Sequence, residues 1–368
     1  PYVDKIEGQF RTDFTRTPKA EVLGHMIDDL KFASENLPEN PDNISDVGKL
    51  TKWAAIHLLS EVYLMAGEYA KAEEAALQVI NSGYFHLMNE RFGAQKDQPG
   101  DVFSDMFLEY NQNRTSGNME SIWVMQLEYD TNGGGGKYED LTKRAWVPKY
   151  WNETGFTLCD SLGGRGLAQI VPFKWWIDED GFYTANDVRN SKYNIKRTWY
   201  YNNPETPELL GKEAPVTEST WSKCTIYPVI TKFFYGKTDD SPSYEGNNKD
   251  RMKFRLAETY LLLAEARIRQ NNASGAAEAI NVVRKRAGAP DITASQATMD
   301  FLLDERIREL VGEELRRLTL VRTGKLVERT RKYNSYSNKI YEQHSLCAIP
   351  KTIIDSNTGA DFPQNTGY

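Results

Sequence analysis

The sequence is poor in cysteine and histidine. Its 368 residues include 3 Cys and 4 His. Cys159, Cys224 and Cys347 are far apart and follow no paired spacing, which excludes a zinc pattern and a disulfide framework, although one bridge stays open. No two histidines have metal-site spacing, and no Gly-x-Ser-x-Gly motif occurs. These absences argue against catalysis, and we expect neither a cofactor nor a metal.

Long apolar runs and basic runs are also absent. No apolar stretch approaches the roughly twenty residues that a membrane-spanning helix needs, and we expect no signal peptide within these residues. The formal net charge is -7, and without a basic run this argues against nucleic-acid binding. The length suits one large domain or two.

Apolar residues recur at helical spacing in two parts of the chain, residues 17–85 and 251–330. In the first part, Thr17-Pro18 resembles a helix start, and a Gly67 turn separates two further helices. Steps of three and four between apolar residues indicate one buried face on each helix. Helix, glycine-containing turn and alanine-rich helix is the plan of tetratricopeptide repeats.

The second helical part reads as three helical segments between Arg251 and Leu326. Alanines occur where two helices would cross closely, among them Ala264 and Ala276. Gly288 and Gly324 follow helical runs and suit left-handed helix ends. We expect these segments to continue the scaffold of paired helices.

Between these parts, residues 86–250 lose helical periodicity and gain Gly, Pro, Asn and aromatics. Ser121–Tyr129 is predicted to form a short strand and Gly133–Gly136 a flexible loop. The prolines of residues 331–368 favour an extended segment. The expected fold is mostly α: a single domain with tetratricopeptide-like helix pairs and a large irregular, loop-rich insertion carrying short strands.

Several clusters of charged residues are better explained as structural ion pairs or surface charges than as catalytic or metal sites. Glu305, Glu309, Glu313 and Glu314 alternate with arginines, as helix-face charges with opposite partners do. The acidic stretch Asp178–Asp180, together with Asp187, could hold calcium, but it lacks the terminal Glu of a calcium loop.

The aromatic residues give the best functional signal. They are 12% of the chain, with 8 Trp and 20 Tyr, more polar-tipped rings than a core requires. A ring can stack on the C–H face of a sugar while nearby polar groups bind the hydroxyls. The competing interpretation is that most of these rings pack an insertion poor in aliphatics. The stacking candidates are Trp151, Trp175, Trp176, Trp199, Tyr200, Tyr201 and Trp221, and the hydrogen-bonding candidates are Arg165, Asp187 and Asn202.

The order of several motifs resembles the SusD/RagB family of outer-membrane nutrient-binding lipoproteins of Bacteroidetes. The motifs are RTPKAEVLGHMIDDLKFASENLP, GKLTKWAAIHLLSEVYLMAGEYAKAEEAALQVINSGYFHL, DSLGGRG, NDVRN, RLAETYLLLAEA, AINVVRKRAGAP, LLDERIRELVGEELRRL, RTGKL, AIP and QNTGY. One departure is Glu314-Leu315-Arg316-Arg317-Leu318, where the family commonly has Glu-Gly-x-Arg-aromatic. The other is that the family's signal peptide, lipid-bearing Cys and first helical repeat would precede Pro1.

This resemblance implies a non-catalytic, lipid-anchored protein on the outer face of the outer membrane. It would capture an oligosaccharide or polysaccharide and pass it to a SusC-like TonB-dependent transporter, with the helical scaffold facing the transporter. Three alternatives stay open: a peptide or glycoprotein-glycan binder in the same kind of complex, a tetratricopeptide adaptor for a protein partner, and a glycoside hydrolase.

Overall fold

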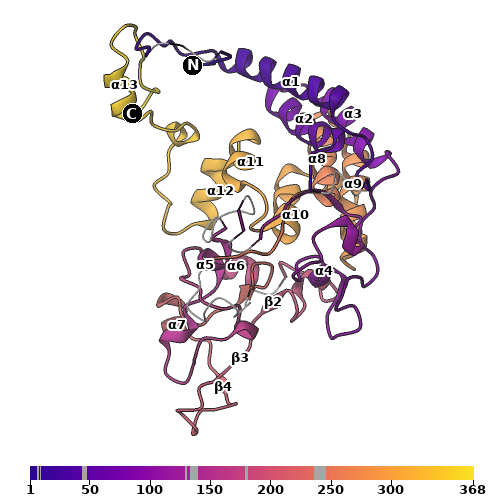
Figure 1. Cartoon of the computed structure of the whole chain (residues 1–368), viewed down its shortest axis with the longest axis vertical. Helices are drawn as coiled ribbons and strands as arrows, with labels where there is room; N and C mark the ends of the chain where they lie inside the picture. The colour runs from indigo at the N-terminus through magenta and orange to yellow at the C-terminus, as the bar shows by residue number, and fades with distance from the viewer. Residues whose placement is uncertain are drawn as a thin grey trace.

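Helices and irregular chain occupy different ends of the molecule (Figure 1). The computed structural model describes residues 1–5, 8, 10–43, 48–128, 131–132, 140–178, 181–235 and 246–368. The α-helices are α1 (Lys19–Asn36), α2 (Lys52–Ala66), α3 (Tyr69–Ile80), α4 (Val102–Asp105), α5 (Thr142–Trp146), α6 (Lys174–Ile177), α7 (Glu218–Ser222), α8 (Leu256–Arg269), α9 (Ala273–Arg286), α10 (Met299–Leu310), α11 (Arg316–Arg322), α12 (Leu326–Tyr333) and α13 (Lys351–Ser356). Within the described ranges, no helix is both long enough and apolar enough to cross a membrane.

The long helices pack as successive neighbours: α1 on α2, α2 on α3, α3 on α8, and α8 on α9. Helices α3 and α8 therefore lie side by side although the whole irregular region separates them in sequence. Ala72, Ala76, Ala264 and Ala276 have no exposed surface, because small side chains let the helices approach closely. The prediction of a mostly helical fold with an alanine-packed, tetratricopeptide-like scaffold is confirmed.

Glycine ends several helices as the sequence predicts. Gly67, Gly288 and Gly324 have φ angles of +80°, +71° and +73°, a left-handed conformation that glycine adopts without a Cβ clash. The predicted cap at Thr17 is wrong, because Pro18 occupies the N-cap position. The Thr17 hydroxyl instead accepts a hydrogen bond from the Tyr2 N–H at 2.7 Å.

In the part of the chain that the structure describes, the strands form three short antiparallel pairs. The prediction of a strand after Ser121 is confirmed, but the prediction that the Arg251 segment begins as a helix is wrong. Residues 251–255 pair with the Ser121 strand, with Ser121 opposite Arg255, and α8 begins only at Leu256. The pairs are β1 (Ser121–Met125) with β6 (Arg251–Arg255), β2 (Ile195–Lys196) with β5 (Val229–Ile230), and β3 (Trp199–Tyr200) with β4 (Glu213–Ala214).

The helical segment predicted up to Leu326 is interrupted after α10. Gly312 has a φ of +78°, and a Cβ there would lie 2.4 Å from the Phe233 ring. The chain can therefore turn at this glycine and bring the irregular region against the scaffold. The C-terminal segment is also less extended than predicted, because it contains α13.

A buried ionic network joins the scaffold to the irregular region around Glu309. This carboxylate has no exposed side-chain surface and contacts the guanidinium groups of Arg189, Arg255 and Arg286. Arg189 comes from the irregular region, Arg255 from β6 and Arg286 from α9. Glu309 is thus a buried link between distant segments and not the helix-face charge that the sequence suggested, whereas Glu305 also forms a predicted helix-face pair, with Arg308 at 2.9 Å.

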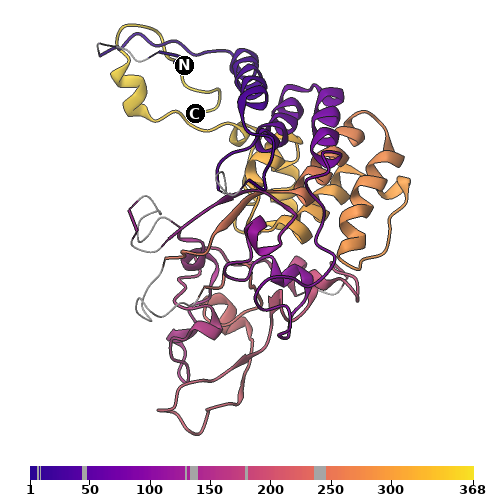
Figure 2. The same ribbon diagram turned by 45° about the vertical axis from the view of Figure 1, so that its right-hand side comes forward.

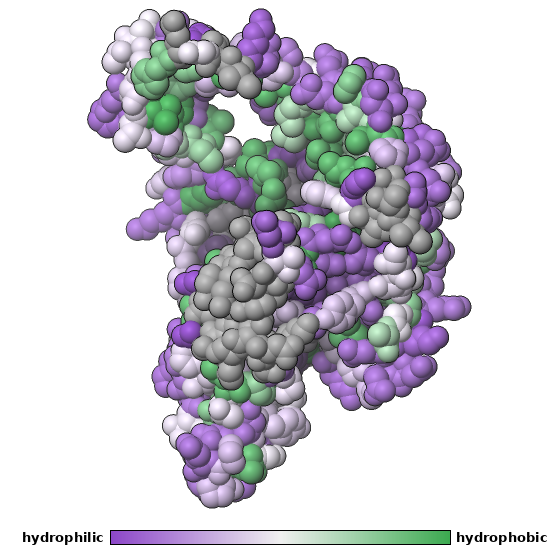
Figure 3. Space-filling view, in the orientation of Figure 1, coloured by the Kyte–Doolittle hydropathy of each residue, from purple (hydrophilic) through white to green (hydrophobic). Residues whose placement is uncertain are grey.

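The two ends of the chain lie together beside the helices (Figures 1 and 2). The Phe14 N–H donates to the Asn357 side-chain oxygen at 2.8 Å, and the Asn357 side-chain amide donates to the Phe14 carbonyl at 2.9 Å. The Gly359 N–H also donates to the Thr12 carbonyl at 2.7 Å. Apolar surface is concentrated over these two terminal segments and the nearby helices (Figure 3).

Candidate binding site

A cavity of about 750 Å³ lies where the irregular region meets helices α10, α11 and α12. In Figure 1, α5 and α6 lie below α12, with α10 to their upper right, and form one side of this junction. The cavity size is in the range of small-molecule sites. Its lining includes the aromatic residues Trp146, Phe173, Trp175, Trp176 and Tyr333 and the charged residues Asp140, Arg251, Glu314, Arg316 and Arg329.

Trp175 and Tyr333 form a stacked pair on the cavity wall. Their ring centroids are 4.2 Å apart and the ring planes differ by 25°. A third ring, that of Phe182, packs against Trp175 in a T-shaped arrangement, with 5.3 Å between the ring centroids. The indole nitrogen Nε1 of Trp175 is buried and finds no hydrogen-bond partner among the described residues. Since a buried indole N–H normally has an acceptor, this donor suits a polar group of a ligand.

Trp146 and Trp176 are more buried than Trp175 and offer little exposed surface to the cavity. Trp146 is 9% exposed and stacks on Phe233 at 5.6 Å. Trp176 is 7% exposed and packs with Ile177 and Ile195 in an apolar cluster. Of the predicted pair, Trp176 therefore packs in the core and Trp175 faces the cavity, because adjacent residues of a helix point in different directions. Trp175 is the more accessible of the two.

Two of the charged side chains in the lining are held by neighbours outside the cavity wall. Glu314 accepts from Arg306 Nε at 2.6 Å and from the Thr319 hydroxyl at 3.1 Å. Arg329 pairs with Asp300 at 3.2 Å and also with Asp304. Glu314 and Arg329 therefore line the cavity in fixed positions and cannot move to contact a ligand.

A model of the SusD family matches residues 99–348. The chain belongs to the SusD family. The family match covers both the irregular region and the helices that enclose the cavity.

Curated relatives extend this similarity over most of the chain. The SusD-like protein P38 of Formosa agariphila is 26% identical over 347 residues, 89% of this chain and 62% of the relative. The starch-binding protein SusD of Bacteroides thetaiotaomicron is 26% identical over 87% of this chain and 60% of the relative. This SusD-family chain therefore spans about three fifths of the length of these relatives.

Solved structures share the fold. Surface glycan-binding protein A from Bacteroides thetaiotaomicron, solved in complex with laminarihexaose, gives a TM-score of 0.67 at 21% identity, over 94% of this chain and 70% of that one. A SusD-like protein from Bacteroides fragilis gives 0.68 at 19% identity, over 100% and 75%. At these identities the likeness concerns the fold.

The remaining predicted rings of this SusD-family chain lie outside the cavity lining. Trp199 has no exposed surface, and its indole N–H donates to the Tyr227 carbonyl at 3.2 Å. The prediction that Trp199 stacks on a ligand is wrong in this structure, since a fully buried ring offers no open face. Its neighbour Tyr200 is 52% exposed, because successive strand residues point to opposite sides. Tyr201 is half-buried, with its ring 5.0 Å from Phe156.

Trp151 and Trp221 are half-buried and each carries a cation over its ring. The Arg165 guanidinium lies 5.1 Å from the Trp151 ring centroid, and Trp151 Nε1 donates to the Gly166 carbonyl at 3.2 Å. The Lys174 ammonium lies 5.2 Å from the Trp221 ring. A cation over a ring competes with a sugar for that face, so these two rings remain weaker candidates.

The predicted hydrogen-bonding residues Asp187 and Asn202 have structural partners. Asp187 is 3% exposed, and its carboxylate accepts two bonds from the Arg189 guanidinium at 2.8 Å. The prediction that Asp187 binds a ligand is therefore wrong in this structure. Asn202 clamps Thr157, accepting from its N–H and donating to its carbonyl, both at 2.9 Å.

The calcium hypothesis gains no support from the described part of the chain. No group of three or more His, Cys, Asp or Glu side chains is placed there to share a metal ion. Glu179 and Asp180 lie outside the described residues, and Asp187 is committed to Arg189. Cys159, Cys224 and Cys347 are free thiols, so the open possibility of a bridge is not realised.

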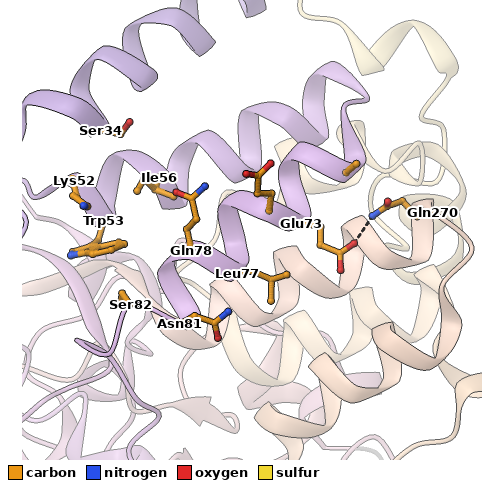
Figure 4. A pocket seen from close by; sticks show the side chains of 12 residues that line it. Ser34, Lys52, Trp53, Ile56, Glu73, Leu77, Gln78, Asn81, Ser82 and Gln270 are labelled. Carbon is orange, nitrogen blue, oxygen red and sulfur yellow. Dashed lines mark hydrogen bonds between the residues drawn. The ribbon is translucent and has the colours of Figure 1, made fainter.

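A second cavity of about 730 Å³ lies against helices α1, α2 and α3 (Figure 4). Its one tryptophan, Trp53, is 6% exposed and has the Lys52 ammonium 4.7 Å from its ring. Glu73 accepts a hydrogen bond from Gln270 at 2.7 Å (Figure 4). Tyr333 also has cations near its ring, with Arg329 and Lys332 each 4.8 Å from its centroid. The preference for the first cavity therefore rests on Trp175, which is more exposed than Trp53.

Sequence reasoning missed Tyr333, Arg251 and Arg316. Tyr333 is the last residue of α12 and falls in a stretch predicted to be extended, and Arg251 was assigned to a helix. A pattern search within the irregular region could not find these residues, because they come from the scaffold side of the junction.

Proposed function

We propose that this chain binds a glycan, without cleaving it, in the cavity beside Trp175. The observation that carries the proposal is the Trp175–Tyr333 stack at 4.2 Å on the wall of a cavity of about 750 Å³. Sugar rings present C–H groups on their faces and hydroxyls on their rims. An aromatic wall beside unpaired polar atoms, such as Trp175 Nε1, complements both features.

The names of the relatives support the same class of ligand. One curated relative is a starch-binding protein, and solved neighbours include a laminarin-binding SusD-like protein and a complex with laminarihexaose. Because this chain spans about three fifths of the curated relatives, the ligand is assigned here from the cavity and only supported by these names.

The charged groups of the cavity favour binding over hydrolysis. A glycosidase uses two carboxyl groups that flank the scissile bond, one of them as a proton donor. Glu314 accepts hydrogen bonds from Arg306, Arg316 and Thr319, so it is not placed as a free proton donor beside a glycosidic bond. Incubation with any glycan that binds should therefore release no reducing ends.

Calorimetry with soluble glycans tests the proposal. Laminarin and starch should be included with other neutral and acidic polysaccharides, and at least one should bind. Trp175→Ala should weaken that binding by up to about ten-fold, since a lost stacking contact is worth about 0.5–1.5 kcal/mol. Trp175→Phe, which keeps a ring, should lose less.

Tyr200→Ala is the matched control, because Tyr200 is an exposed ring of the same region outside the cavity. Unchanged affinity in Trp175→Ala would remove the cavity assignment, and lost affinity in Tyr200→Ala would move the site to β3. Peptides in the same panel separate a glycan binder from a peptide binder.

The finer part of the proposal is delivery to a TonB-dependent transporter at the outer membrane. It rests on the family resemblance, in which the helical scaffold faces the transporter. Purification of the tagged chain from its native cells should recover a TonB-dependent transporter, and this recovery should survive Trp175→Ala. Recovery of a different protein that binds at the second cavity, beside Trp53, would instead support an adaptor.

A further inference from the structure

Arg316 keeps most of its hydrogen-bonding capacity free inside the cavity. It begins α11, and its Nη1 donates to Glu314 at 2.9 Å. An arginine has five N–H donors, and no other hydrogen bond of this guanidinium occurs among the described residues. Its side chain is 28% exposed, so the remaining donors are accessible to a molecule in the cavity.

Arg251 is a second cation with spare donors on the same lining. It is the first residue of β6, and its side chain is 30% exposed. The closest carboxylate in the described chain is that of Asp140, with 3.8 Å between Arg251 Nη1 and Asp140 Oδ2. That distance is an ionic contact but too long for a hydrogen bond.

Asp140 is the one carboxylate on the cavity wall that retains a free acceptor. It is 4% exposed, and its Oδ1 accepts from the Thr142 N–H at 2.7 Å. Its Oδ2 is buried and has no hydrogen-bond partner in the described part of the chain. Buried polar atoms without partners are rare, so this oxygen suits a ligand hydroxyl group.

Arg316 differs from the arginines of the buried network. Arg255 contacts Glu120, Glu309 and Glu313, and although burial opposes its charge, these carboxylates raise the pKa of Arg255 well above its ordinary value. Burial lowers the pKa of Arg316, and the single partner Glu314 offsets this only in part. Arg316 is therefore a cation whose charge the protein compensates incompletely.

We propose that the glycan bound in this cavity is acidic, carrying a carboxylate or sulfate group that Arg316 binds, with Arg251 as the second cation. The fork of N–H donors on an arginine matches the oxygens of both anions. Trp175 would contact the sugar face, and Asp140 Oδ2 would accept one hydroxyl. This inference rests on the proposed function and narrows its substrate class.

Chemically matched ligand pairs test the charge directly. Oligogalacturonate should bind at least ten-fold more tightly than its methyl ester, or sulfated carrageenan oligosaccharides more tightly than desulfated ones. Whichever pair responds identifies the anion as carboxylate or sulfate. The preference should shrink in about 0.5 M NaCl, because salt screens accessible charges.

Two substitutions locate the preference. Arg316→Gln should weaken binding of the acidic ligand about ten-fold more than binding of its neutral partner, and Arg251→Gln should act in the same direction. Arg317→Gln is the matched control, because Arg317 is the next residue of α11 but does not line the cavity. It should leave both affinities unchanged.

The outcomes separate this inference from the function on which it rests. If neutral glycans bind as tightly as acidic ones and Trp175→Ala weakens binding, the glycan site stands and the acidic preference is overturned. If neither member of any pair binds and no other glycan does, both proposals fall. An acidic preference that survives Arg316→Gln and Arg251→Gln also overturns the assignment.

Discussion

The helical scaffold and the irregular region of this chain are stabilised in different ways. The scaffold buries aliphatic side chains and alanines between long helices, in a cluster that includes Leu261, Leu262 and Ala264. The irregular region has short helices and strands of two to five residues, and one of its clusters is built around rings such as Trp199, Tyr150 and Tyr227. Large rings fill space between segments that have no regular spacing, because they bury much area per residue.

This difference explains why a high content of aromatic residues is a weak guide to ligand contact. Trp199 lies in the core of the irregular region, and Trp151 and Trp221 are partly covered by cations. Trp175 is accessible because it lies at the border with the scaffold, where Tyr333 meets it. The functional surface thus forms where the two kinds of packing meet.

The largest effect should come from cutting the ionic network that joins the two regions. Glu309→Gln removes the charge that faces Arg189, Arg255 and Arg286. Leaving buried charges without a partner should lower the free energy of unfolding by about 3–5 kcal/mol, measured by urea denaturation. Glu278→Gln is the control: Glu278 is 72% exposed, 3.9 Å from Arg267, and its loss should change stability by less than about 0.5 kcal/mol. Equal effects of both would contradict a structural network.

A comparison of adjacent residues tests the role of rings within the irregular region. Trp199→Ala should cost about 3–5 kcal/mol of unfolding free energy because it leaves a large cavity in the aromatic core. Tyr200→Ala, which truncates the exposed neighbour, should cost less than about 0.5 kcal/mol. A small cost at Trp199 would show that the core tolerates the loss by collapsing.

Overpacking tests the scaffold side of the comparison. Ala276 has no exposed surface, so Ala276→Leu should lower the free energy of unfolding by about 1–3 kcal/mol. Ala273→Leu, at an exposed position of the same helix, should be nearly neutral. Similar changes in the free energy of unfolding for the two variants would mean that α9 does not pack tightly against its neighbours at Ala276.

Acid should weaken the protein through carboxylates paired with cations. Burial alone would raise the pKa of Glu258, but the contacts with His57 and Arg306 lower it from 4.5 to about 2. A carboxylate with a lowered pKa in the folded state stabilises the fold above its unfolded pKa, and this contribution is lost as the pH falls through the folded value. The free energy of unfolding should therefore decrease between pH 4.5 and about pH 2.

The slope of that decrease can be assigned to single residues. One titrating carboxylate contributes up to about 1.4 kcal/mol per pH unit. In urea denaturations over this pH range, Glu258→Gln should reduce the slope by at most that amount relative to the unchanged chain. An identical slope in the variant would exclude Glu258 as a contributor.

The scaffold was largely predictable from the sequence, because periodic apolar positions and glycine caps are local signals. The prediction failed at residues 251–255, whose strand depends on a partner more than a hundred residues away in the chain. It failed again at Gly312, where the break between α10 and α11 depends on contact with Phe233. Both errors concern segments whose conformation is decided by distant partners.

The candidate site was predictable only in part. Trp175 follows from the density of rings in the irregular region, but nothing in that pattern separates it from the buried Trp199. Asp187 was selected as a polar residue near rings, yet Arg189 two residues later takes up its carboxylate. Arg251 and Arg316 could not be selected, because their spare donors are visible only once the partners of the other arginines are known.

The Trp175–Tyr333 stack has a consequence for biosynthesis. Its two rings come from widely separated parts of the polypeptide, so the wall cannot form until the ribosome has synthesised both Trp175 and the whole of α12. A product truncated between these two segments would retain its early helices while lacking half of that wall.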